Sequence, residues 1–141
     1  MMSNKKRILF VCTENSARSQ IAEALMRSLA GDRFEVFSAG TEPSEVDPRA
    51  LAAIEHFGLN SHDLRSKSLS EFEDREFDYV VSLCEKAAFE CEPLALGKQF
   101  MAWNFEDPKI HGGPNIFNLT LKDINERIKL FLLVCDKEPS R

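Results

Sequence analysis

The chain has 141 residues and a formal net charge of −5, because it contains 18 Lys and Arg but 23 Asp and Glu. A chain of this length buries about two-thirds of its unfolded surface, so we expect one domain, residues 1–141, that folds without a disulfide or a metal. The acidic balance argues against nucleic-acid binding, and no apolar run is long enough to span a membrane or act as a signal peptide. We expect a cytoplasmic monomer whose four cysteines serve chemistry or core packing.

Apolar and polar residues follow one another in the pattern of strands and helices. Ile8 to Val11 form a solid apolar run, which is typical of a buried parallel strand. Residues 19–29 place apolar side chains along one stripe of a helix, and Gly31 follows it. The predicted elements are, in chain order, strand 6–11, helix 19–29, strand 34–39, helix 48–57, a short helix capped by Ser70 that ends at Glu73, strand 79–83, strand 100–103 and a last helix capped by Thr120.

This order of elements indicates an α/β fold in which a four-stranded parallel sheet carries helices on both faces. Ligands of such folds bind at the carboxyl ends of the strands. Cys12, Cys84 and Asp107 each come just after a predicted strand. We therefore expect these three residues at one edge of the sheet, although they lie far apart in sequence.

The loop between Cys12 and Arg18 has the features of an anion site. Its length lets successive backbone N–H groups point inward, and the helix that follows adds its own free N–H groups. The Arg18 guanidinium matches two oxygens of a tetrahedral oxyanion, and the positive surroundings favour the Cys12 thiolate, which is the attacking form. The alternative is a buried Cys that ends a strand and a surface Arg that starts a helix. The predicted substrate-binding loop comprises Thr13, Glu14, Asn15, Ser16, Ala17, Arg18 and Ser19.

Residues 11–24, VCTENSARSQIAEA, resemble the phosphate-binding loop of the low-molecular-weight protein tyrosine phosphatase superfamily. Within that superfamily the chain is most similar to the thioredoxin-coupled arsenate reductases, because Cys84 and Cys91 stand at matching positions with matching spacing. Further similarity is carried by Ser38-Ala39-Gly40, Ser66-Lys67, the strand into Cys84, and Asp107-Pro108.

The resemblance implies a relay of three thiols and no cofactor. Cys12 attacks arsenate, which phosphate or sulfate can mimic, and forms a covalent adduct. Cys84 then attacks the Cys12 sulfur and arsenite leaves with two electrons. Cys91 attacks Cys84, and thioredoxin or a similar thiol reductant reduces the Cys84–Cys91 disulfide. The resemblance also implies that Asp107 is the general acid, with Glu106 as a rival carboxylate and a plain Asp-Pro turn as the alternative reading.

The spacing of the last two thiols adds a geometric constraint. If residues 84–91 were helical, their two end Cα atoms would be separated by about 10 Å of rise, whereas a disulfide needs them within about 7 Å. We therefore expect oxidation to open residues 84–93. The alternative role for this pair is structural, as buried cysteines in the core. For Cys135 we expect only a core or partly exposed position.

Three residues are expected to support the loop. Asn15 and Ser38 should hydrogen-bond it into shape. Some arsenate reductases hold a potassium ion near the positions of Asn15, Glu23 and Ser38, with an aspartate as the last ligand. Lys67 stands at the position of that aspartate. We therefore expect the Lys67 ammonium to replace the ion.

Two loop residues differ from the family pattern, and the histidines are not spaced like metal ligands. Ala17 stands where many relatives have a fourth loop cysteine, and Glu14 where a glycine is common. A carboxylate beside an anion site is unfavourable unless it points outward. The three histidines, His56, His62 and His111, form no metal-binding pattern, so we expect no metal.

Two other functions fit the same loop. The first is a phosphatase that acts on phosphotyrosine or a small phosphoester with Cys12, Arg18 and Asp107. Related phosphatases carry tyrosines after the Asp-Pro pair, whereas Lys109-Ile110 follows here, which disfavours an aromatic substrate. The second is a thiol redox sensor or an anion-binding regulatory module.

Overall fold

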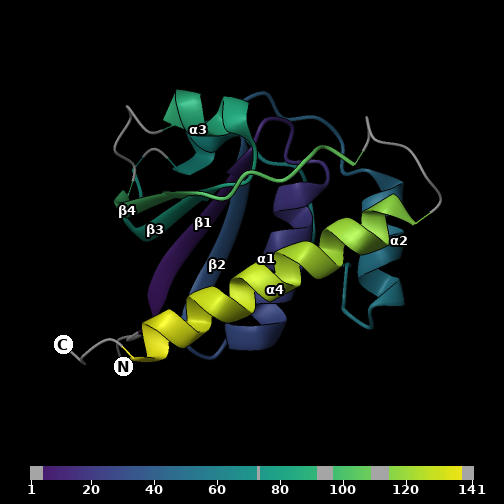
Figure 1. Cartoon of the computed structure of the whole chain (residues 1–141). Helices are drawn as coiled ribbons and strands as arrows, with labels where there is room; N and C mark the ends of the chain where they lie inside the picture. Colours follow the sequence, from purple (N-terminus) through teal and green to yellow (C-terminus); the bar gives the residue numbers. More distant parts are fainter. Residues whose placement is uncertain (1–4, 73, 92–96, 109–114, 138–141) are drawn as a thin grey trace.

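The computed structural model describes residues 5–72, 74–91, 97–108 and 115–137 (Figure 1). Strands and helices follow one another along these residues, with one short 3₁₀ helix, η1, before the third strand. The elements are β1 (Lys6–Cys12), α1 (Arg18–Ala30), β2 (Phe34–Gly40), α2 (Pro48–His56), η1 (Leu69–Phe72), β3 (Phe77–Ser82), α3 (Glu85–Cys91), β4 (Gly97–Ala102) and α4 (Ile116–Lys137).

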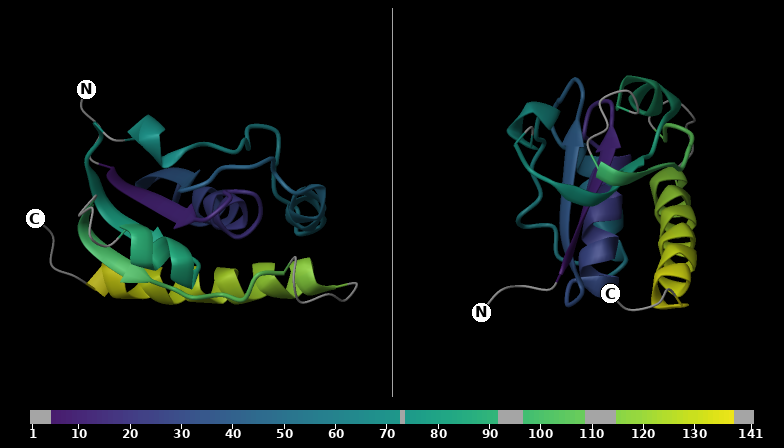
Figure 2. Two further views of the ribbon diagram at one scale, coloured as in Figure 1. Left: turned by 90° about the horizontal axis from the view of Figure 1, so that it is seen from above. Right: turned by 90° about the vertical axis from the view of Figure 1, so that its left-hand side faces the viewer.

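The four strands form one parallel sheet in the order β2-β1-β3-β4. Its helical layers differ on the two faces, since α4 packs with α1 on one face and η1 lies on the other (Figure 2). The predicted fold class is therefore confirmed. The register pairs Cys12 with Gly40 and Val11 with Ser82, so the strands end together at one edge. This edge carries the loops that follow β1, β2 and β3.

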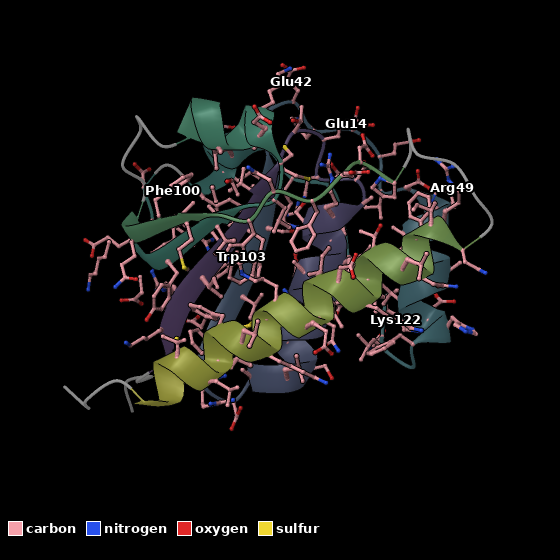
Figure 3. All side chains as sticks on the ribbon, viewed as in Figure 1. Glu14, Glu42, Arg49, Phe100, Trp103 and Lys122 are labelled. Atoms are coloured by element: carbon pink, nitrogen blue, oxygen red, sulfur yellow. The ribbon has the colours of Figure 1, made fainter. Side chains whose placement is uncertain are left out.

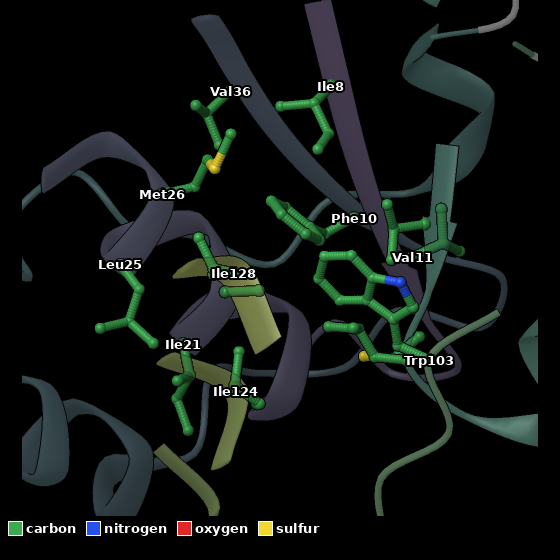
Figure 4. Packing of buried hydrophobic residues seen from close by; sticks show 14 of the residues in the cluster. Ile8, Phe10, Val11, Ile21, Leu25, Met26, Val36, Trp103, Ile124 and Ile128 are labelled. Carbon is green, nitrogen blue, oxygen red and sulfur yellow. The ribbon is translucent and has the colours of Figure 1, made fainter. Parts of the chain in front are cut away.

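The core fills the space between the sheet, α1 and α4 (Figure 4). Ile21 and Leu25 on α1, and Ile124 and Ile128 on α4, are buried and recur every four residues, which places each pair on one helix face. Trp103, just after β4, packs its ring 5.8 Å from Phe131 of α4, measured between centroids. This contact fixes the chain where it leaves the sheet toward Asp107. Among the residues that the structure describes, no helix has both the length and the hydropathy to cross a bilayer.

Two expected helix caps were wrong. Helix α4 begins at Ile116, so Thr120 lies buried one turn inside it. The helix starts early because the apolar Phe117 is buried and its ring stacks with the Arg49 guanidinium, 4.7 Å from the centroid. Ser70 lies inside η1, and its backbone N–H donates to the Ser68 hydroxyl, which therefore acts as the cap.

The boundaries of β4 and the start of α2 are explained by solvent exposure and capping. β4 is an edge strand and begins at Gly97, three residues before the predicted start, because backbone pairing with β3 extends into polar residues that face solvent. Trp103 lies after its end. Helix α2 begins as predicted, with Pro48 in its first turn and the Asp47 carboxylate accepting from the Arg49 backbone N–H at 2.8 Å.

Candidate active site

A cavity of about 340 Å³ opens at the carboxyl edge of the sheet. It brings together residues from the loops after β1, β3 and β4, as the strand order predicts. Cys12 and Cys84 are buried in its wall, and Asp107 closes it from the side of β4. The lining comprises Cys12, Thr13, Glu14, Ser16, Ala17, Arg18, Cys84, Lys86 and Asp107.

The backbone carbonyls of the loop are all bound from outside the cavity. Segment 41–47 donates backbone N–H groups to the carbonyls of Cys12, Thr13, Glu14 and Ser16, at 2.8 to 3.3 Å. The Gln20 side chain donates to the carbonyl of Asn15, and the Ile21 backbone N–H donates to that of Ala17. Because N–H and C=O point in opposite directions across a trans peptide, the N–H groups of this loop are directed toward the cavity. The loop thus has the donor arrangement that a tetrahedral anion requires.

Asn15 holds the loop through all four positions of its side-chain amide. Its backbone is left-handed, with φ of 51°, a conformation that Asn tolerates better than most residues. The amide oxygen accepts from the Lys67 backbone N–H at 2.7 Å and from Gln20, which fixes the orientation of the amide. The amide nitrogen therefore donates to Ser19 and Ser38, at 2.7 and 3.1 Å. The expected contact between Asn15 and Ser38 is present.

The Cys12 sulfur lies 2.9 Å from the Ser19 hydroxyl oxygen. That oxygen already accepts a hydrogen bond from Asn15. The Ser19 proton is therefore available to the sulfur, and a hydroxyl that donates to a sulfur stabilises its charged form. The Ser19 hydroxyl does not cap the helix, since α1 has no side-chain cap.

Arg18 and Asp107 lie next to each other in the lining of the cavity. The Arg18 guanidinium donates to the Phe105 carbonyl at 2.8 Å, and its second terminal nitrogen lies 3.7 Å from an Asp107 carboxylate oxygen. These contacts hold both terminal nitrogens of the guanidinium on the side of Phe105 and Asp107. Glu106, the rival carboxylate, is exposed and lines a neighbouring hollow against Ile116 of α4. The geometry thus favours Asp107 over Glu106 as the acidic group at the loop.

Cys84 lies directly before α3, and Cys91 is the last residue of that helix. The Cys84 sulfur lies 3.4 Å from the Thr13 hydroxyl and accepts from the Ala87 backbone N–H at 3.4 Å. It therefore shares the cavity wall with Cys12. The side chain of Cys91, like Lys109-Ile110 and His111, lies outside the described residues. Cys135 is partly buried as expected, 3.8 Å from the Tyr79 hydroxyl in the core.

Behind the loop lies a buried ionic cluster centred on Glu23. The Lys67 ammonium contacts Glu23 and Ser38 at 3.4 Å and donates to the Arg65 carbonyl at 2.7 Å. Burial lowers the pKa of Lys67 below its ordinary value, and the Glu23 carboxylate opposes that shift. Arg27 supplies a second cation to Glu23, at 2.7 Å. The ammonium thus lies between Glu23 and Ser38, whereas the Asn15 side chain is contacted by the Lys67 backbone N–H.

Two contributors were missed at the level of sequence. Gln20 is buried and holds the loop, and its signal was a polar residue on the buried side of an apolar helix. Lys86 lines the cavity and pairs with Glu42, but nothing in the local pattern connects residues so distant in sequence. Glu14, by contrast, is exposed at the rim and accepts from the Ser16 hydroxyl at 3.3 Å, so the departure from glycine is accommodated by the outward position (Figure 3).

The fold and the site together define a class of α/β protein in which an anion-binding loop lies between a cysteine at the end of β1 and an arginine at the start of α1. A family model described as low molecular weight phosphotyrosine protein phosphatase matches residues 7–140. The chain belongs to this family.

Its similar proteins include several arsenate reductases. That of Halalkalibacterium halodurans is 35% identical over 133 residues, which cover 91% of this chain and 96% of the relative. A structure described as an arsenate reductase in the phosphate binding state has a TM-score of 0.80 and 30% identity, covering 91% of this chain and 97% of its own. The thioredoxin-dependent arsenate reductase of Corynebacterium glutamicum has a TM-score of 0.77 and 30% identity, covering 95% of this chain and 63% of that protein.

Gly40 gives a test of the loop geometry. A Cβ at this position would lie 2.7 Å from the Thr13 carbonyl oxygen and 2.9 Å from the Asn15 backbone nitrogen. Gly40→Ala should therefore push the loop away from β2 and weaken phosphate binding by about tenfold or more, since each backbone donor contributes roughly 1 kcal/mol. Isothermal titration calorimetry of phosphate against the reduced protein measures this.

The matched control is Gly97→Ala at the opposite end of the sheet, where the new Cβ would meet a Val80 methyl at 2.7 Å. This variant should lose stability by about 1–3 kcal/mol in urea unfolding while it keeps its phosphate affinity. Unchanged phosphate affinity in Gly40→Ala would show that the close approach of β2 does not shape the loop.

Proposed function

We propose that the protein is a cytoplasmic arsenate reductase that converts arsenate to arsenite with three cysteines and thioredoxin as the electron donor. The observation that carries the proposal is the position of Cys84. Its sulfur lies in the wall of the cavity that holds Cys12, at the start of a helix that ends at Cys91. A phosphatase has no need of this second thiol. The activity of the arsenate reductases to which the chain is similar supports the same conclusion.

The first step is nucleophilic attack on the bound anion. The inward N–H groups of the loop and the Arg18 guanidinium bind the oxygens of arsenate, and the Ser19 hydroxyl contacts the attacking Cys12 sulfur. The sulfur forms a bond to arsenic while one arsenic–oxygen bond breaks. Asp107 donates a proton to the leaving oxygen, which departs as water.

The second step transfers the electrons. Cys84 attacks the Cys12 sulfur, a disulfide forms between them, and the electron pair of the sulfur–arsenic bond stays on arsenic. Arsenic is thereby reduced from the +5 to the +3 state and leaves as arsenite. Cys91 then attacks the Cys84 sulfur and frees the Cys12 thiolate. The thioredoxin dithiol returns two electrons to the Cys84–Cys91 disulfide.

Single cysteine variants distinguish this relay from a phosphatase. Cys84→Ser and Cys91→Ser should each reduce arsenate at least about 100-fold more slowly than the wild type in a thioredoxin-coupled assay, because the electron path is cut, while both keep phosphate binding. Intact mass spectrometry after one turnover should find a Cys12–Cys84 disulfide accumulated in Cys91→Ser.

Cys135→Ser is the matched control, because its sulfur lies against Tyr79 in the core and not in the cavity. It should keep full activity. Arsenate reduction retained in both relay variants would contradict the proposal. Unchanged hydrolysis of a phosphoester in those variants, without arsenate reduction by the wild type, would instead select the phosphatase.

Helix α3 must open for the relay to finish. Its seven residues, Glu85–Cys91, are helical, so Cys84 and Cys91 stand about 10 Å apart along the axis and cannot form a disulfide as they are. Oxidation should therefore raise hydrogen exchange across residues 84–93 by about tenfold or more, since the helical hydrogen bonds are lost. Exchange measured by mass spectrometry with α4 as the internal reference tests this. Equal protection in both redox states would exclude the opening.

Lys67 should make activity independent of potassium. Its ammonium already supplies positive charge between Glu23 and Ser38, so a monovalent cation would add no further stabilisation at this position. The rate of arsenate reduction in potassium chloride and in sodium chloride at equal ionic strength should agree within about a factor of two, because the two salts screen surface charges equally. A clear activation by potassium over sodium would contradict this role of Lys67.

A further inference from the structure

The cavity has one cation that the relay does not use. Lys86 is the second residue of α3 and lines the cavity together with Cys12 and Arg18. Its ammonium contacts the Glu42 carboxylate at 3.0 Å. Glu42 belongs to the segment after β2, where its backbone N–H binds the Thr13 carbonyl, and its side chain lies at the same end of the molecule as Glu14 (Figure 3).

The charges of the lining make this cation important. Arg18 and Lys86 are the cationic side chains among the described lining residues, and Glu14 lies at the exposed rim. Arg18 is already shared between the Phe105 carbonyl and Asp107. A bound dianion and a Cys12 thiolate would add further negative charge, so the cavity needs another cation near the anion.

The pair of Lys86 with Glu42 is exposed to solvent. Its side chain is 55% exposed and that of Glu42 is 64% exposed. Ion pairs between such exposed side chains are weak because water screens them. The lysine stem is flexible, and a dianion in a partly enclosed cavity attracts an ammonium more strongly than a solvated carboxylate does.

We propose that Lys86 is a substrate-binding residue that exchanges Glu42 for an oxygen of the bound tetrahedral anion. The inference rests on the anion site of the proposed function and adds a residue to it. The exchange also breaks the link between α3 and the segment after β2. Binding of the anion thus also releases the first turn of α3, the helix that directly follows Cys84.

Paired substitutions test the exchange through opposite effects on phosphate affinity. Lys86→Gln should weaken phosphate binding to the reduced protein by about tenfold, because one charge-assisted hydrogen bond is lost. Glu42→Gln should strengthen it by about threefold, because a competing acceptor is removed. In the double variant Glu42→Gln should no longer increase phosphate affinity, since Glu42 affects binding only through Lys86.

Two substitutions at the other end of the sheet control for the change in net charge. Lys98→Gln breaks the exposed pair with Asp78, and Glu35→Gln breaks the exposed pair with Arg7. Both should leave phosphate affinity within about a factor of two when titrated at the same ionic strength, because screening weakens charges at this distance.

Calorimetric titration with phosphate needs no turnover, so its result is independent of whether the protein reduces arsenate. Opposite shifts for the two single variants, with no Glu42→Gln gain in the double variant, support the exchange. Weaker binding in both single variants would show that the ion pair is merely structural, and unchanged binding in Lys86→Gln would remove Lys86 from the site. Either of these results overturns the proposal.

Discussion

The outward hydrogen bonding of the loop carbonyls is the constraint on which the site depends. Segment 41–47 and Gln20 bind the carbonyls of residues 12–16 from behind, and this alone turns the N–H groups toward the cavity. The arrangement requires β1 and β2 to be neighbours that end together, as the pairing of Cys12 with Gly40 provides. The sheet is therefore more than a scaffold, because its register decides where the anion binds.

Much of the fold could be predicted because local patterns carried it. The apolar run of β1, the stripe of α1 and the Asp47-Pro48 start of α2 each record burial or capping within a few residues. The start of α4 could not be read in this way. Thr120 has the chemistry of a cap, but the burial of Phe117 between elements outweighs that local preference.

The residues of the site also divide into those that local patterns predict and those that depend on distant contacts. Cys12, Arg18 and Asn15 lie in one short loop whose spacing has a direct chemical meaning, and the structure brings the first two to the cavity as expected. Gln20 and Lys86 depend on contacts with residues far away in sequence, such as Arg65 and Glu42. No periodicity or motif reports such contacts, so only the three-dimensional arrangement shows them.

The shortness of α3 has a consequence for the energetics of the proposed cycle. A helix of seven residues is marginal by itself, so opening it requires little free energy. In the proposed cycle this stability exists only while Cys84 and Cys91 are thiols, because a disulfide between them would exclude the helix. Folding of α3 therefore favours the reduced form and raises the reduction potential of the couple. In the proposed cycle, refolding of the helix therefore makes reduction of the disulfide by an external dithiol more favourable.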